Sequence, residues 1–408
     1  MPLVEGTTVG VLGAGAMGAG IAQVAATNGH PVVLVDESRG ALERARTGLE
    51  RAMQREVERG RLDGSRASAI AARVRYRAVA EDGLQAFEPC ALVIEAVVEN
   101  MDVKCALFAR VGAIVGTDCV LATNTSSLPI ARVAAASPRP ERVLGVHFFN
   151  PAPVMPLVEI VPWVGTDPAV TAGARALVDG WKKTTVVAAD TPGFIVNRVA
   201  RPFYGEALRL YEEGIADVAT IDWAARELGG FRMGPFELMD LIGQDVNFAV
   251  TTSVYEGLFH DPRFTPSVTQ QRLVDAGRLG RKTGRGFYDY SDGAVRPEPR
   301  TDRQSGLGLV HRILVMLING AVEAVHWRVA SPADIDLAVT KGVNYPRGLL
   351  AWGAELGFDW VLGQLSALHD AYGEDRYRPS VLLRRIVREG PTSLGDWQRA
   401  NVGEGTPG

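Results

Sequence analysis

The sequence is poor in the residues that build disulfide frameworks and metal centres. Its 408 residues include only 3 cysteines and 6 histidines. Cys90, Cys105 and Cys119 form no CxxC pair, which excludes a disulfide scaffold and gives none of the usual zinc-ligand spacings. We therefore expect no bound metal ion and a reducing, cytoplasmic location.

Long apolar runs and an excess of positive charge are also missing. We expect no membrane-spanning segment, and no signal peptide because a β-branched strand begins by Thr8. The net charge of -4 argues against a general nucleic-acid-binding protein. A charged content of 22% is typical of globular chains, and this length predicts two or three domains.

A glycine-rich motif lies between two predicted strands near the N-terminus. The strand Thr8–Leu12 leads into GxGxxG, an alanine-rich helix follows over Ala19–Asn28, and a second strand covers Pro31–Val35. In this context the motif predicts dinucleotide binding, with the pyrophosphate at the helix N-terminus. The residues expected to line the cofactor are Gly13, Ala14, Gly15, Ala16, Met17 and Gly18.

An acidic residue follows the second strand at the position that selects the cofactor. Asp36 should accept hydrogen bonds from the ribose hydroxyls and repel a 2′-phosphate, which favours NAD over NADP. Arg39 lies close by in sequence and leaves NADP open as the alternative.

Polar residues follow the next buried strands. Runs over Ala91–Val98 and Val120–Thr123 each end in polar side chains, and ligands of open α/β sheets bind beyond the carboxyl ends of the strands. We therefore expect that the edge of the sheet at the carboxyl ends of its strands holds Glu99, Asn124, Ser126 and His147. The structural alternative is that Ser126 or Ser127 caps a helix beginning near Pro129.

The stretch from Leu144 to Ile160 carries the candidate catalytic pair. His147 ends one apolar run, and Glu159 lies 12 residues later in a second one. If the two strands are neighbours, the carboxylate can hold one ring nitrogen and raise the basicity of the other, as a general base requires. A partly buried ion pair is the alternative interpretation.

Strands and helices alternate up to about Asp190, and helical periodicity follows. This predicts an α/β Rossmann-type doubly wound sheet over residues 1–190, then an all-α region. A helix should run from Phe194 to about Glu213, with Asn197 as a polar residue on its apolar face, suited to a ligand.

The helical region repeats itself. Ile221-Asp222 recurs as Ile335-Asp336 and Gly234 as Gly348, both 114 residues later. Further matches pair Pro266–Val268 with Pro379–Val381, Gly243 with Gly357, and Gly277 with Gly390. We expect a helical substrate or dimerisation domain over 191–290, a linker over 291–305 and a structural second copy over 306–400. The second copy could replace a partner subunit, so a monomer and a homodimer both stay open.

Taken together, these motifs closely resemble the L-3-hydroxyacyl-CoA dehydrogenases. The resemblance extends in order over about residues 5–290 and rests on GxGxxG, Glu99-Asn, Asn124-Thr-Ser126-Ser, His147-Phe-Phe-Asn150-Pro, Glu159, Asp190-Thr-Pro-Gly-Phe-Ile-Val-Asn197-Arg and Arg281-Lys282-Thr-Gly. It implies that NAD is the cofactor and that a 3-hydroxyacyl-CoA is oxidised to the 3-oxoacyl-CoA in fatty-acid β-oxidation or phenylacetate breakdown.

The resemblance also implies roles for single residues. His147 would be the base, Glu159 would hold it, and Ser126 and Asn197 would hydrogen-bond the substrate. The residues implied to contact or organise NAD are Glu99, Lys104, Asn124, Asn150 and Lys282. Arg59 stands where the family usually has a coenzyme A-binding lysine, and Ala52 departs from an expected serine.

Two other functions fit the same fold. The first is a sugar-acid (gulonate-type) 3-dehydrogenase with similar Ser/His/Glu chemistry, which Phe148-Phe149 disfavours. The second is a non-enzymatic NAD-binding protein, which the presence of His147, Glu159 and Asn197 disfavours.

Overall fold

The computed structural model describes residues 3–81 and 83–389. The chain divides after Thr191 into two compact units. The end of the expected second helical copy, residues 390–400 with Gly390, lies outside the described residues.

The first unit is built on one eight-stranded sheet, in the order β3-β2-β1-β4-β5-β6-β7-β8. The strands are β1 (Val9–Leu12), β2 (Val32–Asp36), β3 (Val74–Ala78), β4 (Leu92–Glu95), β5 (Val120–Thr123), β6 (Val143–Phe148), β7 (Leu157–Pro162) and β8 (Thr184–Val187). All neighbours are parallel except β6 and β7. The predicted Rossmann-type α/β fold is confirmed.

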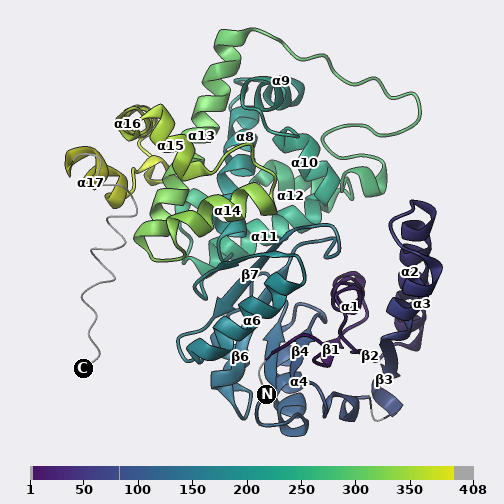
Figure 1. Cartoon of the computed structure of the whole chain (residues 1–408). Coiled ribbons are helices and arrows are strands. Elements are labelled where there is room, and N and C mark those ends of the chain that lie inside the picture. Colours follow the sequence, from purple (N-terminus) through teal and green to yellow (C-terminus); the bar gives the residue numbers. More distant parts are fainter. Residues whose placement is uncertain (1–2, 82, 390–408) are drawn as a thin grey trace. The chain divides into compact units, whose positions relative to one another are not determined.

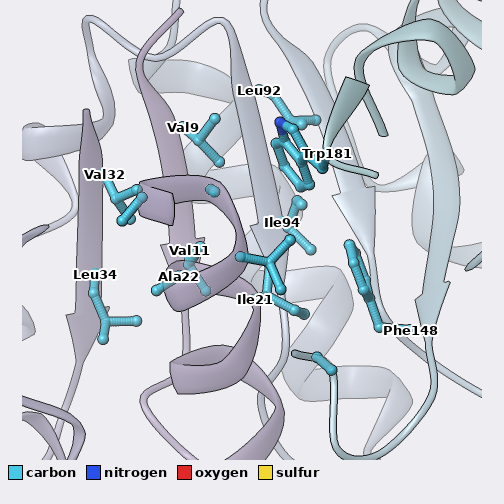
Figure 2. Packing of buried hydrophobic residues seen from close by; sticks show 14 of the residues in the cluster. Val9, Val11, Ile21, Ala22, Val32, Leu34, Leu92, Ile94, Phe148 and Trp181 are labelled. Atoms are coloured by element: carbon cyan, nitrogen blue, oxygen red, sulfur yellow. The ribbon is translucent and has the colours of Figure 1, made fainter. Parts of the chain in front are cut away.

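Helices cover both faces of this sheet (Figure 1). They are α1 (Ala16–Thr27), α2 (Arg39–Glu58), α3 (Gly64–Ala72), α4 (Met101–Ile114), α5 (Ile130–Ala135) and α6 (Pro168–Gly180). Figure 2 shows Ile21 and Ala22 of α1 packed on Val11 and Ile94 of the strands. Residues of α2 and α6 join the same buried cluster, whereas Phe108 of α4 packs on the opposite face.

Strand β3 was not anticipated from the sequence. Its apolar and charged residues alternate, with Arg75 exposed and Val74 buried. It pairs only with β2 at the edge of the sheet, where one side of a strand faces water. The strand therefore lacks the continuous apolar run that predicted the buried strands.

The second unit is helical, with isolated β-bridges near Gly280 and Arg285 in the described part. The first copy holds α7 (Val196–Val199), α8 (Arg201–Glu212), α9 (Val218–Trp223), α10 (Pro235–Ile242), α11 (Gln244–Gly257) and α12 (Val268–Asp275), and a π-helical turn lies at Ala224–Leu228. The second copy holds α13 (Arg303–His326), α14 (Pro332–Gly342), α15 (Leu349–Leu356), α16 (Phe358–Tyr372) and α17 (Val381–Glu389). Short 3₁₀ turns elsewhere in the chain lie at Val79–Glu81, Gln85–Phe87, Pro140–Arg142, Pro262–Phe264, Arg281–Thr283 and Asp375–Tyr377.

Two predicted helix boundaries were wrong. The single helix expected from Phe194 is broken at Ala200, so that α7 and α8 are separate elements. Helix α13 begins at Arg303, inside the expected linker, because Asp302 caps it by accepting a hydrogen bond from the Ser305 amide.

The sequence repeat corresponds to a shared capping device. Asp222 accepts hydrogen bonds from two amides at the start of α10, both 2.9 Å long. Asp336 does the same at the start of α15, at 2.8 and 3.0 Å. A Cβ on Gly234 or Gly348 would lie 2.3 or 2.2 Å from the capping carboxylate of its copy, which explains why glycine recurs there.

Helix α13 corrects the expectation about apolar runs. It has 24 residues and is apolar enough, by length and composition alone, to cross a membrane. However, 72% of its most apolar window is buried in the structure, and the helix packs on α8 of the first copy. This is the environment of a core helix.

Candidate active site

The candidate base and its carboxylate face each other across two strands. His147 on β6 lies opposite Glu159 in the antiparallel register of β7. Imidazole Nδ1 lies 2.7 Å from Glu159 Oε2, and the glutamate is fully buried. Because a carboxylate only accepts hydrogen bonds, Nδ1 donates, which makes Nε2 the basic nitrogen. The arrangement can therefore take up a proton and stabilise the resulting imidazolium.

Glu99 organises the polar loop that follows β5. Its Oε1 accepts hydrogen bonds from the Thr125 hydroxyl, from the Ser127 hydroxyl at 3.0 Å and from the Ser126 amide at 3.2 Å. Burial alone would raise the pKa of Glu99, but the charge of Lys104 and these hydroxyl bonds hold it below its usual value. Glu99 thus stays ionised and fixes the backbone that carries Ser126.

A buried ion pair supports this loop from below. Lys104 Nζ lies 2.7 Å from Glu95 and 3.3 Å from Glu99, and only 1% of the lysine side chain is exposed. Glu95 also accepts from the Thr123 hydroxyl and the Val97 amide, each at 2.7 Å. Lys104 therefore stabilises, from its buried position, the two carboxylates that hold the loop after β5.

Sequence reasoning missed Glu95 as a site residue. A usable signal was present, because Glu95 is an acid within an otherwise apolar strand. A buried carboxylate needs a cationic or hydrogen-bonding partner, and Lys104 lies nine residues further along the chain.

Asn124 ties the end of β5 to the end of β6. Its side-chain oxygen accepts from the Phe148 amide at 2.8 Å, one residue after His147. Neither Ser126 nor Ser127 caps α5, contrary to the alternative considered from the sequence. Asp190 instead accepts from the first two amides of α5, at 2.9 and 2.8 Å.

The glycine-rich turn fits a dinucleotide. Gly13 has φ of 104°, and a Cβ there would lie 2.5 Å from a backbone oxygen of Ala96. A Cβ on Gly18 would lie 1.8 Å from a Gly13 backbone oxygen, whereas Gly15 faces open space. No side chain caps the first turn of α1, so its amides are suited to a pyrophosphate.

The acid at the end of β2 is held beside this turn. Asp36 accepts from the Ala14 amide at 2.6 Å and from the Ser38 amide at 2.7 Å. Arg39 pairs with Glu81, and both side chains are largely exposed. The pairing partly neutralises the cation that favoured the NADP alternative.

The remaining expected site residues are placed as follows. Arg59, at the end of α2, pairs with Glu56 at 3.4 Å and is exposed. Asn150 is exposed in the loop after β6. In the second unit, Asn197 is half-buried on α7, and Lys282 Nζ lies 2.6 Å from Asp245.

The doubly wound sheet, the uncapped glycine turn and the His–Glu pair define an NAD-dependent oxidoreductase. The family model for the NAD-binding domain of 3-hydroxyacyl-CoA dehydrogenase matches residues 8–191. The model for the C-terminal domain of that family matches twice, at 193–290 and 309–396. The chain belongs to the 3-hydroxyacyl-CoA dehydrogenase family, and its C-terminal region is duplicated.

Individual relatives agree with this family. A 3-hydroxyadipyl-CoA dehydrogenase of Escherichia coli (strain K12) is 40% identical, with 93% of this chain and 97% of the relative covered. The mitochondrial hydroxyacyl-coenzyme A dehydrogenase of Sus scrofa is 40% identical over 69% of this chain and 90% of the relative. A solved 3-hydroxybutyryl-CoA dehydrogenase structure from Escherichia coli K12 superposes with a TM-score of 0.88 at 38% identity, covering 95% of this chain and 99% of that one.

Proposed function

We propose that this enzyme oxidises an L-3-hydroxyacyl-CoA to the 3-oxoacyl-CoA with His147 as its general base. The observation that carries the proposal is the 2.7 Å contact between His147 Nδ1 and the buried Glu159 carboxylate. NAD held by the glycine turn would supply the acceptor for the hydride that leaves C3. His147 Nε2 takes the proton of the 3-hydroxyl, and Glu159 stabilises the imidazolium that forms.

The other site residues position the reactants. Ser126, on the loop fixed by Glu99, and Asn197 hydrogen-bond the substrate oxygens and place C3 for transfer. Asp36 selects the ribose hydroxyls of NAD, and the amides of the glycine turn bind its pyrophosphate. Exposed Arg59 offers a positive charge to coenzyme A phosphates.

We propose that NAD is contacted or organised by Glu99, Lys104, Asn124, Asn150 and Lys282. The second copy has no counterpart of Asn197 in its sequence and supports the first copy. We propose a cytoplasmic enzyme that is either a monomer, for which the duplication would suffice, or a homodimer.

The acyl group is the least determined part of the substrate. The names of the two Escherichia coli proteins specify a dicarboxylic six-carbon chain in one case and a four-carbon chain in the other. We propose that this enzyme acts on short acyl chains of one of these two kinds.

A spectrophotometric assay tests the reaction. Acetoacetyl-CoA should be reduced with loss of NADH absorbance, and NADPH should be used more slowly because Asp36 repels its 2′-phosphate. Faster turnover with NADPH would show that Arg39 outweighs Asp36. Tight NADH binding without turnover of acetoacetyl-CoA or any short 3-oxoacyl-CoA would favour the sugar-acid or non-enzymatic alternative.

A further inference from the structure

Arg201 is a buried cation without a carboxylate partner. It begins α8, and only 7% of the residue is exposed. Its Nη1 donates to the Thr251 hydroxyl at 3.2 Å and the Asn247 carbonyl at 3.5 Å, whereas its Nε has no hydrogen-bond partner. Among the described residues, no carboxylate forms an ion pair with Arg201. Burying a charge without a counter-charge is unfavourable. An anion bound beside Arg201 would therefore stabilise the buried guanidinium.

A second unpartnered donor lies beside it. Tyr345 comes from the loop between α14 and α15 in the second copy, and its buried hydroxyl makes no hydrogen bond. The Tyr345 ring packs against Phe203, two residues after Arg201 on α8, with the ring centroids 5.7 Å apart. The Tyr204 ring lies 4.7 Å from the guanidinium carbon. A guanidinium and a hydroxyl on an aromatic platform match the hydrogen-bonding pattern of a carboxylate.

Two other arginines of the second unit whose side chains are largely shielded from water, Arg312 and Arg263, do have carboxylate partners. Arg312 is 8% exposed and binds Glu206 at 2.6 Å and Glu213 at 2.8 Å. Arg263 pairs with Asp261 and Glu323, at 2.5 and 3.2 Å. Arg198, 8% exposed, has no ion pair within 4 Å among the described residues either, but it lines a cavity together with Glu323. Arg201 differs from these arginines because no carboxylate acts on it.

That position is one helical turn from a proposed substrate contact. Asn197 and Arg201 are four residues apart, and the break at Ala200 keeps helical dihedral angles. Residues at this spacing share a helix face and lie about 6 Å apart along the axis. A few carbon–carbon bonds of an acyl chain cover such a distance.

We propose that Arg201 and Tyr345 form a subsite for a carboxylate at the far end of the acyl chain. The inference rests on the proposed function, with Asn197 at the substrate oxygen. It assigns the enzyme to dicarboxylic 3-hydroxyacyl-CoA substrates. It also gives the second helical copy a direct part in substrate selection, through Tyr345.

Two six-carbon substrates that differ only at the chain end test the subsite. The wild type is assayed with 3-hydroxyadipyl-CoA, which ends in a carboxylate, and with 3-hydroxyhexanoyl-CoA, which ends in a methyl group. The wild type should prefer the carboxylate-ended substrate by about tenfold or more in kcat/KM, since a charge-assisted pair is lost with the other. In Arg201→Met, kcat/KM for the carboxylate-ended substrate should fall roughly 10- to 100-fold. The kcat/KM for the methyl-ended substrate should stay within about threefold of the wild-type value.

Two further variants separate the subsite from general effects. Tyr345→Phe should produce a smaller loss that is confined to the carboxylate-ended substrate. Arg272→Met removes an exposed cation of α12, and it should leave the ratio of the two substrates unchanged.

The outcomes distinguish this inference from the function on which it rests. Turnover of the methyl-ended substrate alone, or an equal loss of both in Arg201→Met, would overturn the subsite and leave the dehydrogenase activity standing. If the wild type turns over neither substrate, both the subsite and the proposed dehydrogenase activity are overturned. If Arg201→Met does not fold, inhibition of the wild type by substrate analogues tests the subsite instead. Adipyl-CoA should then inhibit more tightly than hexanoyl-CoA. Equal inhibition by the two compounds would overturn the subsite.

Discussion

His147 and Glu159 are directly opposed in the antiparallel pair β6–β7, with a 2.7 Å hydrogen bond between the imidazole and the carboxylate. Both side chains are buried, the glutamate completely. A carboxylate held at Nδ1 fixes the orientation of the ring and favours its cationic form. This relationship lets one side chain serve as a proton acceptor during hydride transfer.

Replacing the proposed base should abolish most of the turnover while the cofactor still binds. His147→Gln keeps a polar side chain but cannot accept the proton, so kcat should fall about 10²- to 10⁴-fold. Steady-state assays with acetoacetyl-CoA measure the rate, and NADH fluorescence titration is the control. Near-normal turnover would show that His147 is not the base.

Replacing its partner should have a smaller effect of the same kind. In Glu159→Gln the amide can still accept from Nδ1 but no longer stabilises a cation. A hydrogen bond to a charged group contributes about 1.5–3 kcal/mol, so kcat should fall roughly 10- to 100-fold. Single-turnover reduction measures this directly, with NADH affinity unchanged. An unaltered rate would remove Glu159 from the mechanism.

Lys104 should be essential to the stability of the first unit. Lys104→Met leaves the Glu95 carboxylate, only 2% exposed, without its cation, which costs about 3–5 kcal/mol. Urea unfolding measures the loss. Arg132→Met is the control, because its pair with Asp102 on α4 is exposed and contributes about 0–1 kcal/mol. Equal effects of the two variants would contradict the supporting role of Lys104.

The repeated glycines should be intolerant of a methyl group. In Gly234→Ala the new Cβ would lie 2.4 Å from the Asp222 Cα, so α10 must shift at a cost of about 1–3 kcal/mol. Gly205→Ala, in the interior of α8 with no atom within 4 Å of the new Cβ, should instead stabilise by about 0.5–1 kcal/mol. Thermal unfolding of the two variants should therefore shift in opposite directions.

Asp222 should make the stability of the second unit depend on pH. Burial raises the pKa of Asp222 to about 7, despite the amides and the Tyr288 hydroxyl that bind it, whereas the unfolded value is about 3.9. In the folded state Asp222 therefore stays protonated to a higher pH than in the unfolded state. The contribution of Asp222 to the free energy of unfolding is fully present at about pH 4 and falls by about 1.4 kcal/mol per unit up to about pH 7.

The non-titrating variant Asp222→Asn isolates this dependence. The difference in unfolding free energy between the wild type and the variant should decrease as pH rises through that window, and then level off. Urea unfolding at closely spaced pH values measures it. A difference that does not vary with pH would mean that Asp222 is ionised throughout.

The sequence by itself determined the elements whose signals are local. The glycine turn, the buried parallel strands and the helical repeat were predicted because tight turns, apolar runs and caps depend on neighbours along the chain. Sequence reasoning missed β3, because an edge strand alternates between water and core. It also merged α7 with α8, although Pro202 in the first turn of α8 marks the break, because proline has no N–H with which to continue the preceding helix.

Only the tertiary structure decided which side chains meet across long sequence separations. The sequence named His147 and Glu159 but not the register that opposes them. It gave no indication that Asp190, rather than a neighbouring serine, holds the start of α5, nor that Arg201 is left without a carboxylate. These features depend on desolvation and on distances between separate elements, which the order of residues does not express and the folded chain sets.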